Sequence, residues 1–117
     1  MEAPLEIAFH AVDHSDALEQ RIRKEAARLE HFFERIVSCR IVVERTHHKQ
    51  HQGDLFAVRI HLRLPDGREA NVTRNSDDNH AHEDPYVAVA DAFKAASRLL
   101  QDETRKMRGA KKHHAEQ

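Results

Sequence analysis

The sequence predicts an α+β domain with the order β-α-β-β-β-α, in which a four-stranded mixed sheet carries two parallel helices on one face. Two long stretches, residues 15–36 and 85–107, repeat apolar residues at steps of three and four, the period of an amphipathic helix. Four shorter stretches alternate apolar and polar residues, as strands with one buried face do. A chain of 117 residues is long enough for one such domain with one hydrophobic core.

The first half of the chain predicts a strand, a helix and a second strand. The first strand spans residues 4–9, cap-type residues follow at 13–15, and the helix spans 15–36. A second alternating run covers 38–46. Two strands joined through a helix are expected to be parallel, with a right-handed crossover. The single cysteine, Cys39, lies in this second run and is expected to be a buried, inert thiol.

The second half predicts an antiparallel meander and another helix. Strands over 55–64 and 68–74 flank Pro65-Asp66-Gly67, a tight-turn sequence. The second helix is predicted from Pro85, with Asp84 as its N-cap, to about Met107. Gly109 is expected to end it. The predicted division is a domain over residues 1–108 and a flexible, basic, His-rich tail over 109–117.

Basic residues follow one flank of each predicted helix. These residues are Arg21, Lys24, Arg28, His31 and Arg35 on the first helix, and Lys94, Arg98, Arg105 and Arg108 on the second. Such rows can bind successive phosphates in a salt-dependent, sequence-independent manner. The alternative is a solvated face with intrahelical pairs such as Glu19/Arg23. In parallel helices the two flanks either converge on the groove between them or face outward, and a right-handed crossover favours the outward arrangement.

A polar loop predicted over residues 46–54 contains three clustered histidines, His47, His48 and His51. They are weak candidates for metal ligands, because zinc needs about four converging ligands and no cysteine pair or helical HExxH fixes such a geometry. Solvated loop histidines are the alternative. No cofactor is therefore predicted.

Several function classes find no support in the sequence. It has no glycine-rich phosphate loop and no nucleophile-elbow motif, so we expect neither an enzyme nor a small-molecule substrate. No signal-peptide pattern and no apolar run near 20 residues occur, which predicts a cytoplasmic, soluble protein without a membrane partner. The net charge of −1 leaves nucleic-acid binding to surface patches.

Three pieces in order resemble a known family: LEQRIRKEAARLEHFFERI in the first helix, CRIVVE in the second strand, and EDPYVAVADAFKAASRLLQDETRK at the start of the second helix. They resemble the ribosome hibernation promoting factor and ribosome-associated inhibitor A family, also called ribosomal subunit interface or sigma-54 modulation proteins. The resemblance covers residues 4 to about 108. Its most telling parts are Leu29-Glu30-x-x-Phe33-Glu34-Arg35-Ile36 and the alanine-rich segment from Tyr86 to Arg98 and Leu100.

The resemblance implies a non-enzymatic translation inhibitor. Such a protein would bind the small (30S) ribosomal subunit and its 16S rRNA, and occlude the mRNA/tRNA channel under stress or in stationary phase. The chain resembles a short form, without the second domain through which long members pair ribosomes. The family's basic positions match Arg28, Arg35, Arg98 and Lys106. Arg21, Lys24, Lys94, Arg105 and Arg108 extend the same flanks, and the role of His31 stays open. Two alternatives are a metal-responsive protein that uses the histidine loop and an interaction adaptor without RNA contact.

Overall fold

Four strands and two helices follow one another in the predicted order, which confirms the α+β fold. The computed structural model describes residues 4–49, 53–74 and 84–115, and the side chains within 4–45, 56–74 and 84–106. The elements are β1 (Leu5–His10), α1 (Asp16–Phe32), β2 (Ser38–Lys49), β3 (Gly53–Arg63), the short 3₁₀ helix η1 (Pro65–Gly67), β4 (Glu69–Arg74) and α2 (Pro85–Ala115).

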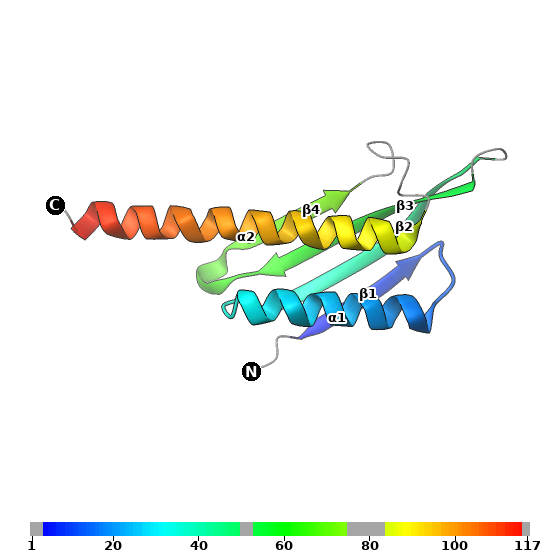
Figure 1. Cartoon of the computed structure of the whole chain (residues 1–117), viewed down its shortest axis with the longest axis horizontal. Coiled ribbons are helices and arrows are strands. Elements are labelled where there is room, and N and C mark those ends of the chain that lie inside the picture. Colours follow the sequence, from blue (N-terminus) through cyan, green and yellow to red (C-terminus); the bar gives the residue numbers. More distant parts are fainter. Residues whose placement is uncertain (1–3, 50–52, 75–83, 116–117) are drawn as a thin grey trace.

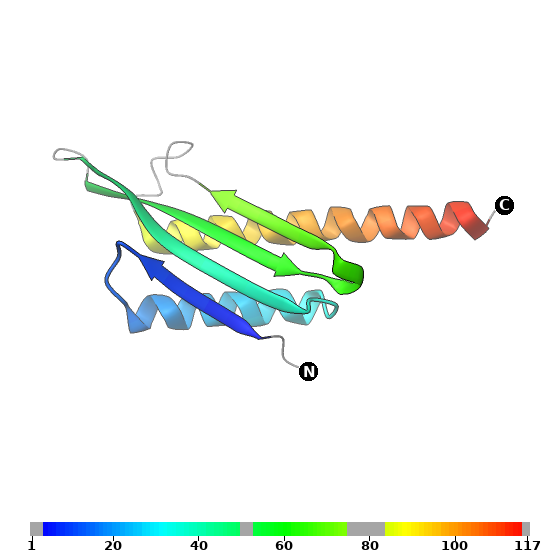
Figure 2. The ribbon, with the colours of Figure 1, turned by 180° about the vertical axis from the view of Figure 1, so that it is seen from behind.

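The sheet has the order β1-β2-β3-β4. Strand β1 is parallel to β2, and the other two pairings are antiparallel, as the sequence predicts. The register aligns Ile7 with Ile41, Ile41 with Ile60, and Ile60 with Val72, which makes one apolar row across all four strands. Both helices cover the face on which this row lies (Figure 1). Neither α1 nor α2 covers the opposite face (Figure 2).

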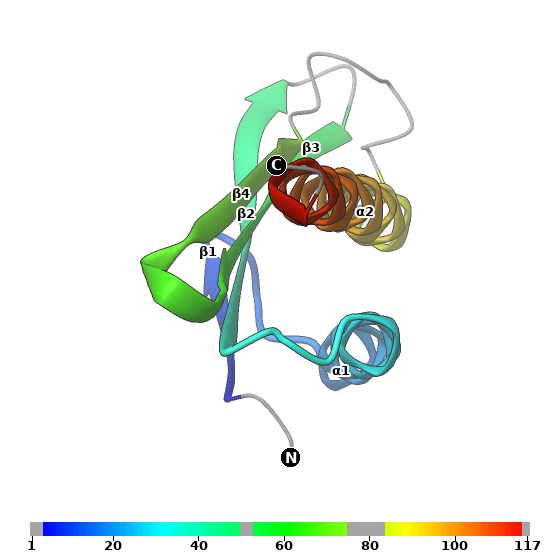
Figure 3. The same cartoon turned by 90° about the vertical axis from the view of Figure 1, so that its left-hand side faces the viewer.

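The core lies between the sheet and the two parallel helices, which Figure 3 shows end-on. Three alanines, Ala88, Ala92 and Ala96, recur every fourth residue of α2 and are fully buried. Their small side chains allow α2 to lie close to β3 and β4, where Ile60 and Leu62 are almost wholly buried. Helix α2 is therefore held in a fixed relation to the sheet.

Helix α1 begins where predicted but ends four residues earlier than the predicted Ile36. Ser15 is the N-cap, and its Oγ accepts a hydrogen bond from the Leu18 amide at 3.2 Å. Phe33 is the C-cap, with φ −130° and ψ 81°, and its amide donates to the Leu29 carbonyl at 2.9 Å. Ile36 still reaches the core from the turn that leads into β2. Because Ile36 is apolar and buried, the apolar spacing in the sequence continues past the residue at which the helix ends, and the predicted helix was too long.

The β2–β3 hairpin corrects the predicted loop over 46–54. Strand β2 continues to Lys49 and β3 starts at Gly53, with a shift of register between Arg45 and His47. Backbone pairing satisfies the amides and carbonyls whatever the polarity of the side chains, so polar residues can extend a hairpin. Residues 47 and 48 therefore lie in a strand, whereas His51 lies outside the described residues.

The tight turn predicted at Pro65-Asp66-Gly67 is present as η1. Gly67 has a φ of 73°, as the turn requires, and Asp66 also has a positive φ of 66°. Aspartate is among the few residues that tolerate this region.

Helix α2 starts at the predicted residue, because Asp84 Oδ1 accepts from the Tyr86 amide at 2.8 Å and Pro85 occupies the first position. The predicted end at Gly109 is wrong: the helix continues to Ala115. An internal glycine costs a helix only about 1 kcal/mol, and the residues around Gly109 are mainly good helix formers with no proline. This end of α2 extends beyond α1 and the sheet (Figure 1). The division into a domain over 1–108 and a flexible tail stays a prediction.

Candidate nucleic-acid interface

The two parallel helices enclose a hollow of about 390 Å³ along their exposed side, the interhelical groove. The groove is lined by Glu25, Arg28, Leu29 and Phe32 of α1 and by Ala90, Phe93, Lys94, Ser97, Arg98 and Gln101 of α2. Three of the predicted phosphate-binding residues, Arg28, Lys94 and Arg98, thus come together here. The outward arrangement that the crossover argument favours is wrong for these three residues.

The rotation of each helix about its own axis explains the convergence. Apolar spacing decides which stripe faces the sheet: Leu29 on α1 and Ala96 on α2 are buried. Arg28 lies about 100° from Leu29 around the helix, so it stands at the edge of the buried stripe. A rotation of about 40° decides whether such an edge residue faces the neighbouring helix or the solvent, and the sequence does not determine that rotation.

The groove holds more positive than negative charge. Arg28, Lys94 and Arg98 are exposed, and none of them forms an ion pair or hydrogen bond within the described part of the chain. Glu25 is the one carboxylate among the lining residues. Unpaired guanidinium and ammonium groups that share a concave surface are suited to bind phosphate oxygens.

Two arginines on the uncovered sheet face, Arg40 and Arg59, have partners instead. Arg59 Nη2 lies 2.8 Å from Glu44 Oε2, and Arg40 Nε lies 3.9 Å from Glu6 Oε1. Such exposed pairs contribute little to stability, but they neutralise the positive charge of these two arginines. The helical face is the candidate interface because three unpaired cations, Arg28, Lys94 and Arg98, share one hollow there.

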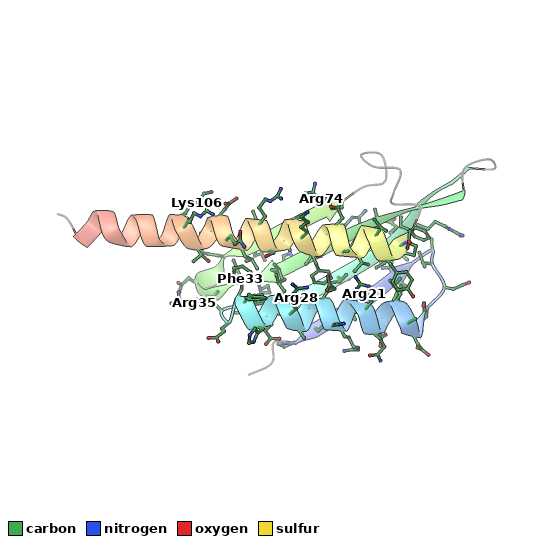
Figure 4. All side chains as sticks on the ribbon, in the orientation of Figure 1. Arg21, Arg28, Phe33, Arg35, Arg74 and Lys106 are labelled. Atoms are coloured by element: carbon green, nitrogen blue, oxygen red, sulfur yellow. The ribbon has the colours of Figure 1, made fainter. Side chains whose placement is uncertain are left out.

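The other predicted residues of the first flank, Arg21, Lys24 and Arg35, do not line the interhelical groove. Arg21 and Arg28 extend from α1 toward α2 (Figure 4), whereas Lys24 is exposed elsewhere on α1 and does not line the groove. Arg35 lies beyond the end of α1, so it does not continue the helical flank of Arg28. It lines a second hollow of about 320 Å³, formed with Phe33 and the η1 turn among others.

The remaining residues of the second flank lie further along α2. Arg105 is exposed one turn beyond Gln101, which ends the groove. Lys106 lies on the side of α2 that faces away from α1 (Figure 4), so the groove does not include this family-matched position. Arg108 belongs to α2, but its side chain lies outside the described residues.

One exposed aromatic residue at the groove was not anticipated. Phe32, the last residue of α1, is 67% exposed and lines both hollows. Its ring makes an edge-to-face contact with His31, with 5.5 Å between the ring centroids. The exposure of Phe32 could have been predicted from the sequence, because adjacent residues of a helix point about 100° apart. If Phe33 packs inward, Phe32 must point elsewhere.

Metal and membrane sites find no support in the part of the chain that the structure describes. No three His, Cys, Asp or Glu side chains gather there as metal ligands, and no helix there is long and apolar enough to cross a membrane. The side chains of His47, His48 and His51 fall outside this part, so the weak metal prediction is untested. Cys39 is buried as predicted, and this burial raises the pKa of its thiol to about 12.

The chain matches the family described as sigma 54 modulation protein / S30EA ribosomal protein over residues 5–108. No curated protein matches it. Among solved structures, a ribosomal subunit interface protein from Coxiella burnetii is 19% identical, with a TM-score of 0.67 over 86% of this chain and 97% of that one. The N-terminal domain of Protein Y from Thermus thermophilus is 16% identical, with a TM-score of 0.60 over 85% and 97%. At these identities the structural likeness establishes the fold.

Proposed function

Because the chain belongs to the sigma 54 modulation protein / S30EA ribosomal protein family, we propose that it inhibits translation by binding the small (30S) ribosomal subunit. The family is ribosome-associated and non-enzymatic. In our proposal the helical face contacts 16S rRNA and the domain occludes the mRNA/tRNA channel under stress or in stationary phase. The protein would then act in the cytoplasm, where idle ribosomes accumulate.

The single observation that carries this proposal is the convergence of Arg28, Lys94 and Arg98, all unpaired within the described residues, on one groove. Folded RNA presents closely spaced phosphates, and cations that bind them release counterions, which makes binding favourable and salt-dependent. Backbone contacts of this kind fix position without reading sequence. An inhibitor that only has to fill a channel needs nothing more specific from these residues.

The sheet supports the same function mechanically. Alanine-lined packing of α2 against β3 and β4, together with the direct contact between α1 and α2, holds the two helices at a fixed spacing. Both sides of the groove are therefore positioned before RNA arrives, so binding loses less conformational entropy than a flexible basic segment would. Arg21, Lys24, Arg35, Arg105, Lys106 and Arg108 would contribute further phosphate contacts around the groove.

Co-sedimentation with purified small subunits tests the proposal. The wild-type protein should pellet with the subunits at low salt and dissociate as salt rises. A double variant, Arg28→Glu with Arg98→Glu, should weaken binding by at least about tenfold, because two attractive contacts become repulsive. The double variant Arg40→Glu with Arg63→Glu makes the same net charge change on the uncovered sheet face, so it is the matched control and should bind like wild type.

Two outcomes would contradict the proposal in different ways. Absence of salt-sensitive co-sedimentation of the wild-type protein would refute ribosome binding. Equal binding of the double variant and the wild type would leave ribosome binding intact but remove the interhelical groove from it. An in vitro translation assay with the same proteins then tests inhibition directly, and its loss should follow the loss of binding.

A further inference from the structure

We propose that Phe32 stacks on an unpaired base of the RNA whose phosphates occupy the interhelical groove. The inference rests on the proposed RNA contact and deepens it. Phosphate contacts alone do not distinguish single-stranded from double-stranded RNA, whereas a stacked base must be free of its own helix. Phe32 would therefore give the groove a preference for RNA with exposed bases.

The position of Phe32 supports this role. It lies four residues after Arg28, so the two side chains are neighbours one turn apart on the same face of α1. Both line the interhelical groove, together with Lys94 and Arg98 of α2. A nucleotide with its phosphate at Arg28 would thus have its base within reach of the Phe32 ring.

The exposure of Phe32 also needs an explanation. It is 67% exposed, and Val37, at 45%, is the next most exposed large apolar residue in the described chain. Its neighbour Phe33 packs against the core, so one ring of the pair contributes to the core and the other remains in solvent. The edge contact with His31 leaves a face of the Phe32 ring unstacked. Aromatic faces beside basic grooves are the usual platforms for single-stranded nucleic acids.

The chain offers a clean spectroscopic test because it contains no tryptophan. In the full-length Phe32→Trp variant, the tryptophan emission, excited selectively over that of Tyr86, reports this position alone. Oligouridylate, a single-stranded RNA with unpaired bases, should quench it saturably at low salt, and duplex RNA of equal charge should quench it much less. Val42→Trp, on the uncovered sheet face, is the control and should not respond to either RNA.

Affinity measurements separate stacking from simple apolar contact. Phe32→Leu, which keeps an apolar side chain but loses the ring, should weaken oligouridylate binding by about 5- to 150-fold, the range that corresponds to about 1–3 kcal/mol for a single stacked base. Phe32→Tyr should bind like wild type. The salt dependence should be unchanged in both variants, because no charge is removed.

The outcomes distinguish failure of this inference from failure of the proposed function. If the wild-type protein binds neither oligouridylate nor small subunits, both proposals are wrong. If the wild type binds oligouridylate and Phe32→Leu binds it equally well, only the stacking is wrong. If Phe32→Leu loses affinity for small subunits while RNA leaves the fluorescence of the Phe32→Trp variant unchanged, Phe32 contacts ribosomal protein, and base stacking is again overturned.

Discussion

Arg28 of α1 and Arg98 of α2 line the same groove, although their helices lie at opposite ends of the sequence. Neither side chain is paired with another residue that the structure describes. The arrangement depends on the sheet, because each helix packs its apolar stripe on the same face, which leaves Arg28 and Arg98 on the exposed side of the helical layer. This geometry leads to the first prediction.

Replacing Arg28 or Arg98 by Gln should lower the salt dependence of binding to small subunits. Each phosphate contact contributes about 0.9 to the slope of log K against log salt, so each variant should lose about one unit of slope. The slope is obtained from dissociation constants measured over a series of potassium concentrations. Arg63→Gln on the uncovered sheet face should keep the wild-type slope. Equal slopes in all four proteins would contradict phosphate contacts in the groove.

The sequence predicted the fold, and three of its predicted basic residues, Arg28, Lys94 and Arg98, line the groove, but their convergence was not predicted. Alternation and helical spacing identify every element, because burial of one face imposes those periods on the chain. They do not determine the rotation that turns Arg28 toward α2, nor the turn that separates Arg35 from α1. Those depend on side-chain packing between helices and on where the chain must bend into β2. Phe32 was not predicted as a site residue, because the apolar spacing assigned Phe33 to the core and the position of the adjacent Phe32 was not considered.

His14 should titrate above its ordinary pKa of 6.5. Its Nε2 lies 2.9 Å from Glu19 Oε1, and this hydrogen bond raises the pKa of His14 and lowers that of Glu19 below 4.5. The imidazolium contributes stability that is fully present below pH 6.5 and is lost as pH rises through the folded pKa. The Glu19 contribution is present above pH 4.5 and is lost as pH falls through its folded pKa. The pair therefore stabilises most between these values.

NMR titration of the His14 ring protons measures the first half of this prediction. Glu19→Gln should return the His14 pKa toward 6.5. A His14 pKa that is the same with and without the Glu19 carboxylate would show that the hydrogen bond is not maintained in solution.

Cys39 should resist thiol reagents in the folded protein. Burial in the core beside β1 and β3 raises the pKa of its thiol to about 12, so almost no thiolate exists near pH 8. Labelling should then follow the opening of the fold and accelerate steeply with urea, whereas the fully unfolded chain reacts at the rate of a free thiol. Rapid, complete labelling without denaturant would show that the second strand is not packed as described.

The ion pair between Arg68 and Glu103 should stabilise the packing of α2 against the end of the sheet. Arg68 follows the η1 turn, Glu103 lies on α2, and the two side chains are only 40% and 25% exposed. Partly buried pairs of this kind contribute about 0.5–1 kcal/mol, so Glu103→Gln should lower the free energy of unfolding by that amount. Urea denaturation of Arg68→Gln, Glu103→Gln and the double variant isolates the coupling between the two residues. Asp102→Asn, an exposed neighbour on α2, should change stability by less than about 0.5 kcal/mol. Additive losses in the double variant would mean that the two side chains do not interact, and that apolar packing alone holds this part of α2.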